Sequence, residues 1–385
     1  MNYKVFILAL STVAVGLVEL IIGGILPTIA DDLNISLGSA GQLITIFALV
    51  FAISSPILLV MTSKMERKKL YLISLFVFFI GNIMTYFSTS FAFMMFARVI
   101  TAMSTGLIIV LSLTIAAKIV QPYHRAKAIG VISMGVSSSL VLGVPLGVII
   151  SDHFGWRVIF LGIAALSIGS FILISIFLER VPGGKPIPLS QQLKAVSSLK
   201  ISSAHFTVMF MLAGHYTLYA YLTPFLEQEL GLNPSWVSIC YLLFGVAAVS
   251  GGGLGGILSD SIGSRKSIIA VIIAFALVLF AIPLTTFSLY VFIPALILWG
   301  ALSWGLSPPL QSYLIETAPE TSDIQQSFHN SSLQLGISLG SAFGALVLSY
   351  TGTVSHIAWF GSGLVVISLL FAIFSLTRKV TDKVI

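Results

Sequence analysis

The stretch Gly256-Ile-Leu-Ser-Asp260-Ser-Ile-Gly263-Ser-Arg265-Lys266 lies between two apolar runs, each long enough to cross a membrane. It follows the eighth apolar run of the chain. A related basic stretch, Ser63-Lys-Met-Glu66-Arg-Lys-Lys69, follows the second run. Similar polar gaps at matching positions predict a duplicated six-helix unit, which is a common plan among transporters.

On either side of these gaps, and along the rest of the chain, the sequence contains twelve apolar runs. A bilayer core of about 30 Å needs roughly 20 apolar residues in a helix. Lipid offers the backbone no hydrogen bonds, so the runs must form helices that bundle together. The expected spans are approximately 5–26, 41–62, 70–88, 92–117, 128–150, 157–178, 204–226, 235–257, 267–286, 289–314, 326–349 and 356–377.

The predicted fold is therefore an all-α membrane protein of twelve transmembrane helices in two pseudo-symmetric six-helix bundles. The longest gap between spans contains Pro182, Pro186 and Pro188 and divides the chain into two sets of six. We expect an amino-terminal bundle over 1–180, a cytoplasmic linker over 181–203 and a carboxy-terminal bundle over 204–385. The later part of the linker, 189–199, has the pattern of a short amphipathic helix.

Composition excludes a soluble protein, because 57% of the residues are hydrophobic and only 8% are charged, against about 25% charged in soluble domains. Every Lys and Arg except Arg98 and Arg157 falls in gaps expected on one face of the membrane. Cationic loops stay in the cytoplasm, so both termini are expected there. Membrane topology thus accounts for the net charge of +6, and no nucleic-acid partner is expected.

The segment from Gly256 to Lys266 resembles the signature loop of the major facilitator superfamily, G-x-L-x-D-x-x-G-x-R-K, and the resemblance covers the whole chain. The first-half copy departs from this pattern, since Ser63 stands where the family has Asp and Glu66 where it has Gly. The segment from Gly135 to Gly147 resembles the antiporter signature of proton-coupled exporters in that family.

Within the superfamily, the chain resembles bacterial efflux pumps for purine bases and nucleosides. The likeness rests on Val15–Leu20, Ala213–Tyr221 and Ser312–Glu316. It implies proton-driven export of purines from the cell by alternating access, across the bacterial cytoplasmic membrane and without a cofactor. Efflux of drugs, or of sugars such as arabinose, is the alternative within transport.

Two ionisable residues lie inside the expected spans at similar depth, Glu19 and Arg98. An ionisable group there is costly and usually faces a cavity or a partner. We expect the two to lie close enough to pair or to compete for a proton, with Glu19 as the proton carrier. The structural alternative is a permanent salt bridge, which is a weak stabiliser when buried.

Candidate substrate contacts come from the seventh and eleventh spans. His215, Tyr216 and Tyr219 lie in the former. In the latter, polar side chains recur at i+4 spacing, which places them on one helix face. Carboxamides match the edges of a nucleobase and aromatic rings can stack on it, although such groups also bind neighbouring helices. The polar face consists of Gln326, Asn330, Gln334 and Ser338.

Two further groups are expected to act in conformational change. Asp260, with Gly263 and Arg265, is expected to gate by capping a neighbouring helix in one state; simple anchoring by basic residues is the alternative. Gly143, Pro145 and Gly147 are expected to let the two halves move relative to each other, and the glycines also permit close helix packing; both roles can hold at once.

Other classes of function are less well supported. The chain has no Gly-x-x-x-x-Gly-Lys-Ser/Thr loop, so ATP is not expected as its direct energy source. An integral-membrane enzyme would need clustered His, Asp or Glu, and a sensor would usually add a soluble domain. No enzyme activity and no metal site are expected, and the protein is expected to be a monomer. The single cysteine, Cys240, excludes an internal disulfide.

Overall fold

The computed structural model describes residues 3–121, 124–183 and 189–378. Within these ranges, eleven helices are long and apolar enough to cross a membrane. The number becomes twelve if a pair bent by 88°, Ser190–Val196 with Leu199–Tyr219, is counted as one span. The predicted all-helical fold with two sets of spans is confirmed, while the linker residues Pro186 and Pro188 lie outside the described ranges.

The amino-terminal half contains six spans, of which the first and fifth are broken into shorter helices. Its spans pack mainly through α1 against α6 and α8, α3 against α5, and α4 against α5 and α8. The elements are α1 (Lys4–Gly24), α2 (Leu26–Asp32), α3 (Leu37–Met61), α4 (Arg67–Tyr86), α5 (Phe91–Lys118), α6 (Arg125–Ser138), the π-helix η2 (Ser139–Gly143), α7 (Val144–Phe154) and α8 (Arg157–Phe177).

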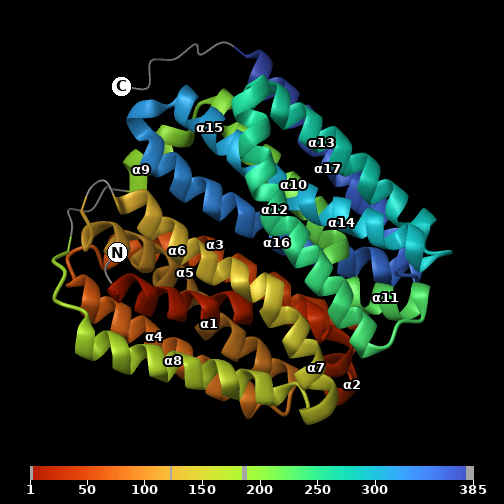
Figure 1. Cartoon of the computed structure of the whole chain (residues 1–385), viewed down its shortest axis with the longest axis horizontal. Coiled ribbons are helices and arrows are strands. Elements are labelled where there is room, and N and C mark those ends of the chain that lie inside the picture. The colour runs from red at the N-terminus through yellow and green to blue at the C-terminus, as the bar shows by residue number, and fades with distance from the viewer. Residues whose placement is uncertain (1–2, 122–123, 184–188, 379–385) are drawn as a thin grey trace.

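The carboxy-terminal half repeats this arrangement, and Figure 1 shows the two halves side by side. Two contacts join them along their length: α3 with α16, and α7 with α12. The elements are α9 (Leu189–Val196), α10 (Leu199–Tyr219), α11 (Leu222–Leu230), α12 (Pro234–Ile262), α13 (Ser264–Ala281), η3 (Ile282–Thr285), α14 (Leu289–Gly305), α15 (Ser307–Thr317), η4 (Pro319–Thr321), α16 (Ser322–Thr351) and α17 (Ser355–Thr377). The helix α9 occupies the segment where a short amphipathic helix was predicted.

The first span of each half breaks at the same relative place, which reflects the internal duplication. In the amino-terminal half α1 gives way to α2 at Ile25, and in the other half α10 gives way to α11 at Tyr221. Proline follows each break, as Pro27 and Pro224. A proline has no N–H for the carbonyl four residues earlier, so it weakens the helix at that point.

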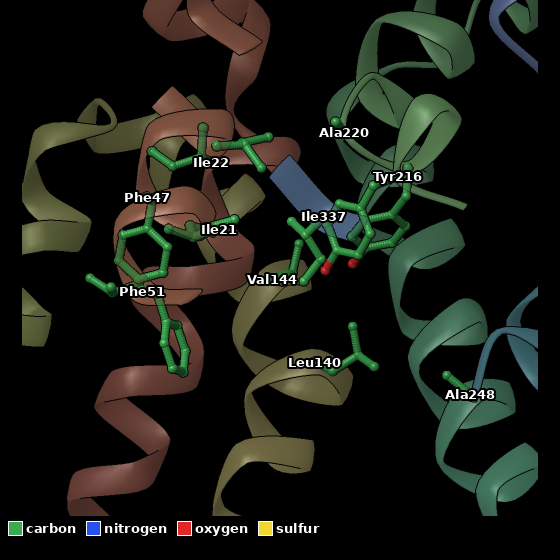
Figure 2. Packing of buried hydrophobic residues seen from close by; sticks show 14 of the residues in the cluster. Ile21, Ile22, Phe47, Phe51, Leu140, Val144, Tyr216, Ala220, Ala248 and Ile337 are labelled. Carbon is green, nitrogen blue, oxygen red and sulfur yellow. The ribbon is translucent and has the colours of Figure 1, made fainter. Parts of the chain in front are cut away.

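The apolar core runs through both halves. Figure 2 shows Val144 of α7 beside Ile337 of α16 and Tyr216 of α10, where the halves meet. Contact between the halves is therefore apolar around a few polar groups, and those groups define the candidate site.

Polar contacts stabilise both ends of the amino-terminal half. On the side that the sequence predicts to face away from the cytoplasm, called the outer side from here on, the guanidinium of Arg157 pairs with Asp32 at 2.7 Å and donates to the carbonyl of Ser88 at 2.9 Å. This accounts for one of the two cations that lie outside the basic gaps. On the inner side, Glu66 caps α4 by accepting from the backbone N–H groups of Lys68 and Lys69, both at 2.9 Å.

Candidate functional site

Glu19 lies in the middle of α1 and is half-buried. Its Oε1 accepts a hydrogen bond from Nε2 of Gln334 on α16 at 2.6 Å. Hydrogen bonds to an ionised partner are shorter and stronger than neutral ones. A membrane-embedded carboxylate of the first half is thus directly joined to the polar face of the second half.

Arg98 lies on α5 beside Glu19 and is 1% exposed. Its Nη1 donates to the carbonyl of Val18 at 2.9 Å and its Nε to the carbonyl of Leu43 at 3.3 Å. Its guanidinium carbon lies 4.0 Å from the ring centre of Phe47. Arg98 and Glu19 interact electrostatically but form no ion pair within 4 Å. The permanent salt bridge weighed from the sequence is therefore absent between these two described residues.

Three hydroxyl groups of the second half bond to backbone carbonyls of the first half on the outer side of Glu19. Thr223 donates to the carbonyls of Gly23 and Gly24, at 2.9 and 3.0 Å. Pro27 cannot donate to the Gly23 carbonyl, so the Thr223 hydroxyl satisfies an acceptor that the helix break leaves free.

Two serines of the second half also donate to backbone carbonyls of the first half. Ser238 donates to the carbonyl of Pro145 at 2.9 Å, and Ser341 donates to the carbonyl of Gly41 at 2.9 Å. Helices α2 and α11 also pack together at this end. The two halves are therefore closed against each other on the outer side in this structure.

The aromatic cluster, defined here as His215, Tyr216, Tyr219, Phe244 and Trp299, lies inside the second half. The His215 ring stacks on Tyr219 at 5.1 Å and on Phe244 at 5.9 Å, and Trp299 lies edge-on at 5.4 Å. The Tyr219 and Phe244 rings are themselves 5.1 Å apart between centres, so His215 is one member of a closely packed group of aromatic rings.

Several buried polar atoms of this region have no hydrogen-bond partner. They include Nδ1 of His215, the hydroxyl of Tyr219, Nε1 of Trp299 and Oε1 of Gln334. Buried polar groups are nearly always paired, so each exception needs an explanation. Tyr216, 9% exposed, lies within electrostatic range of Glu19 and connects the aromatic cluster to the carboxylate.

The predicted polar face of the eleventh span lies on α16, and its exposure changes with depth. Gln334 is 8% exposed, Asn330 one turn further inward is exposed, and Gln326 is half-buried. Trp304, by contrast with Trp299, is 38% exposed on its helix and takes no part in the cluster. The face therefore becomes accessible toward the inner end, opposite to the closed outer end.

The predicted gating loop lies at the junction of α12 and α13. Gly263 has φ of +88°, a conformation that side chains other than glycine rarely adopt. Asp260 and Arg265 are exposed and form no ion pair with another described residue. In this conformation Asp260 thus caps no neighbouring helix.

The glycines predicted to act in conformational change line the contact between α1 and the fifth span. A methyl group on Gly143 would overlap Leu17, and one on Gly147 would overlap Ile21. The same span carries Pro145, whose carbonyl accepts from Ser238 of α12. One helix thus packs tightly on the Glu19 helix and touches the second half.

A second buried polar cluster was not predicted as a unit. His205 on α10 shares a hydrogen bond with Gln325 at 2.9 Å, and Gln325 donates to the carbonyl of Ala195 in α9 at 3.0 Å. Nearby, His329 is fully buried and lies 3.3 Å from the hydroxyl of Ser307. Gln325 and His329 follow the polar start of α16, so their sequence pattern indicated a helix end rather than a core.

No group of three or more His, Cys, Asp or Glu residues arranged to hold a metal ion occurs within the described ranges. The chemistry available at the site is therefore that of one carboxylate, amides, aromatic edges and a buried guanidinium. Such groups bind and release ligands and protons.

Comparison with known proteins places this architecture in context. Residues 8–340 match the model of the Major Facilitator Superfamily. An uncharacterized MFS-type transporter, YbcL of Bacillus subtilis, is 35% identical over 369 residues, covering 96% of this chain and 94% of the relative. The inner membrane transport protein YdhP of Escherichia coli K12 is 26% identical, covering 100% and 98%.

A solved structure shares the fold. It is a bacterial homologue of the human lysosomal transporter Spinster, crystallised in an inward-facing and unoccupied conformation. It superposes with a TM-score of 0.75 at 17% identity and covers 97% of this chain and 95% of that one.

Proposed function

The chain belongs to the Major Facilitator Superfamily, and on that premise we propose that it is a proton-coupled antiporter that exports purine bases or nucleosides from the bacterial cytoplasm. Membrane transport of small molecules is the activity of the family. We further propose that both termini face the cytoplasm, because the basic gaps lie on that side, and that the protein works as a monomer.

The observation that carries the proton coupling is the bond between Glu19 and Gln334. It joins the two halves at the level where the closed outer region ends. An ionised Glu19 accepts from the Gln334 amide. A protonated Glu19 loses its negative charge and with it the strength of a charge-assisted hydrogen bond. Proton binding therefore weakens a contact between the halves and biases the equilibrium between their two arrangements.

Arg98 supports this role because it does not neutralise Glu19 by direct pairing. Its guanidinium is held by two carbonyls and a phenyl ring, so the carboxylate stays available to a proton. The positive charge nearby still favours the ionised carboxylate. Glu19 then releases its proton to the cytoplasm when water reaches it from the inner side.

The proposed substrate follows from the polar atoms without partners. Nδ1 of His215, the Tyr219 hydroxyl and Oε1 of Gln334 offer donors and acceptors. A purine presents a similar mixture of ring nitrogens and exocyclic groups around an apolar plane. A substrate N–H that donates to the ionised Glu19 carboxylate binds only while Glu19 carries no proton, so substrate and proton exclude each other at this residue. This exclusion couples export of substrate to import of a proton.

The test is accumulation of radiolabelled adenine and hypoxanthine in inside-out membrane vesicles, with and without an imposed pH gradient. Accumulation that collapses with the gradient supports the proposal. Gradient-driven movement of a sugar or a dye without purine movement would keep the antiporter and replace the substrate. Purine movement that ignores the gradient would remove the proton coupling.

A further inference from the structure

A pocket of about 530 Å³ lies on the outside of the amino-terminal half, far from the site described above, between the inner ends of α4 and α8. These helices pack against each other along the edge of the molecule (Figure 1). The pocket is lined by charged residues at its inner end and by apolar residues along its length. Its position is where the bilayer core meets the cytoplasmic headgroups.

Three cations, Lys68, Lys69 and Arg180, stand at the headgroup end of the pocket. Lys68 is fixed there because its Nζ donates to the carbonyl of Ser175 on α8 at 2.9 Å. Lys69 and Arg180 are exposed. Their ammonium and guanidinium groups are free to meet an anion that approaches from the membrane surface.

One carboxylate, Glu66, also lines the pocket, but its oxygens are already occupied. They accept from the backbone N–H groups of Val181, Lys68 and Lys69. The cations outnumber this carboxylate, so the pocket keeps a net positive charge. An anion is therefore favoured at this end even with Glu66 ionised.

The rest of the pocket is apolar and follows one face of α4. Leu72, Ile73 and Phe76 lie three to seven residues beyond Lys69, which is one side of a helix. Ile73 is 44% and Phe76 is 49% exposed. Across the groove Phe171 of α8 lies 6.4 Å from Phe76, measured between ring centres. The apolar wall extends about 10 Å into the membrane at 1.5 Å per residue.

We propose that this pocket binds an anionic phospholipid of the inner leaflet, with the phosphodiester against the three cations and an acyl chain along the apolar wall. Basic pockets between membrane helices on the cytoplasmic side are a recurring arrangement for anionic headgroups. Retention of the loop in the cytoplasm requires positive charge alone. It does not require that the charges line a pocket or that an apolar groove continues from them into the bilayer.

The experiment is native mass spectrometry of the full-length protein in detergent, titrated with dioleoyl phosphatidylglycerol. Dioleoyl phosphatidylcholine and inorganic phosphate are titrated in parallel. The variant Lys68→Gln/Lys69→Gln/Arg180→Gln is expected to weaken phosphatidylglycerol binding by about 100-fold, or about fivefold for each cation removed. The single change Arg180→Gln alters only an exposed side chain and is expected to weaken binding about fivefold, which guards against misfolding of the triple variant.

A matched control removes three cations from the same face of the membrane, away from the pocket: Lys118→Gln/Arg125→Gln/Lys127→Gln. Unchanged phosphatidylglycerol binding in this control, together with weak phosphatidylcholine binding, supports the site. Equal loss in both triple variants would show only general attraction to the basic face. Equal binding of the two lipids, or inorganic phosphate binding as tightly as the lipid, would also overturn the proposal.

Discussion

Gln334 donates to Glu19 at 2.6 Å, which joins α16 of the second half to α1 of the first half through their side chains. Outward of it, hydroxyl groups of the second half bind backbone carbonyls of the first. Inward of it, the same face of α16 becomes exposed at Asn330. A single carboxylate–amide contact thus stands between the closed and the accessible part of the molecule.

Replacing Glu19 by Gln should abolish proton-driven accumulation of substrate while leaving the protein folded. The glutamine side chain is nearly the same size and still accepts a hydrogen bond from Gln334, but it cannot exchange a proton. We expect accumulation under a pH gradient to fall to the level of protein-free vesicles, measured in reconstituted liposomes. Full-rate, gradient-dependent transport by this variant would show that Glu19 is not the proton carrier.

Removing the amide with Gln334→Ala should weaken closure on the outer side. A hydrogen bond to a charged group contributes about 1.5–3 kcal/mol, so the outer-closed population should fall roughly 10- to 100-fold relative to the open one. Spin labels at Asp31→Cys and Ser235→Cys, on a Cys240→Ala background, report the distance between the outer ends of the halves. An unchanged distance distribution would mean that this bond does not bias the conformation.

Thr223→Val should destabilise the outer-closed state, because the carbonyls of Gly23 and Gly24 lose their side-chain donor at a helix break. A buried acceptor left without a partner costs about 1–3 kcal/mol. We expect a lower melting temperature in detergent and faster labelling of a cysteine placed on the outer side of α2. Thr223→Ser keeps the hydroxyl and should behave like the parent protein. Equal effects of Val and Ser would assign the loss to packing instead.

Gly143→Ala should impair both stability and transport, because its methyl group overlaps Leu17 on the Glu19 helix. Overpacking of this kind costs about 1–3 kcal/mol. The control is Gly130→Ala, earlier in the same span, where a methyl group meets open space. Melting temperature and transport rate should separate the two variants. Matching losses at both positions would show that the contact with α1 is not their cause, and helix propensity would not explain them either, since alanine favours a helix more than glycine.

Glu66 gives a prediction for pH dependence. Burial disfavours its charged form, but the backbone N–H groups of Val181, Lys68 and Lys69 outweigh this and hold the pKa of the carboxyl below its usual value of 4.5. A lowered folded-state pKa contributes stability above the unfolded-state pKa, and that stability is lost as pH falls through the folded-state pKa. Glu66→Gln should therefore lower the melting temperature at pH 7, and the difference from the parent should shrink as pH falls below 4.5 and through the folded-state pKa of this carboxyl.

This difference is measured by thermal unfolding in detergent across pH 3–8. Lys64→Gln removes an exposed charge from the same loop and serves as the control, with no expected change in the pH profile. A gap between parent and Glu66→Gln that stays constant over this range would show that the carboxyl is not held below its usual pKa by the loop.

Span positions followed from the sequence because lipid imposes a simple length and composition rule. The helix breaks near Ile25 and Val144 were also within reach, since Pro27 and Pro145 mark them. The hydroxyl groups that donate to the carbonyls near these breaks could not be predicted from the sequence. Which hydroxyl meets which carbonyl depends on how whole helices rotate and cross. Thr223 lies eight residues after His215, a spacing that predicts a shared helix face, yet its hydroxyl bonds to carbonyls of α1.

In the candidate site, too, the sequence identified individual residues but not the partners that they contact in the folded protein. The free-energy cost of an ionisable group inside the membrane singled out Glu19 and Arg98 in the sequence. In the structure the two residues interact electrostatically. Their partners differ from the expectation, because backbone carbonyls and the ring of Phe47 compete for the guanidinium. His329 was missed because the polar residues around it match the beginning of a span, where exposure is the ordinary outcome.

The two halves contribute different groups to the hydrogen bonds that close the outer side. Thr223, Ser238 and Ser341 supply hydroxyl donors from the second half, while the first half supplies only main-chain oxygens. Amino-acid changes in the first half leave those oxygens in place unless they move the backbone. During divergence, substitutions there should disturb the closed state only where they move the backbone, as a side chain at Gly41 would by overlapping Tyr221, whereas the second half can lose a contact through a single change to an apolar residue.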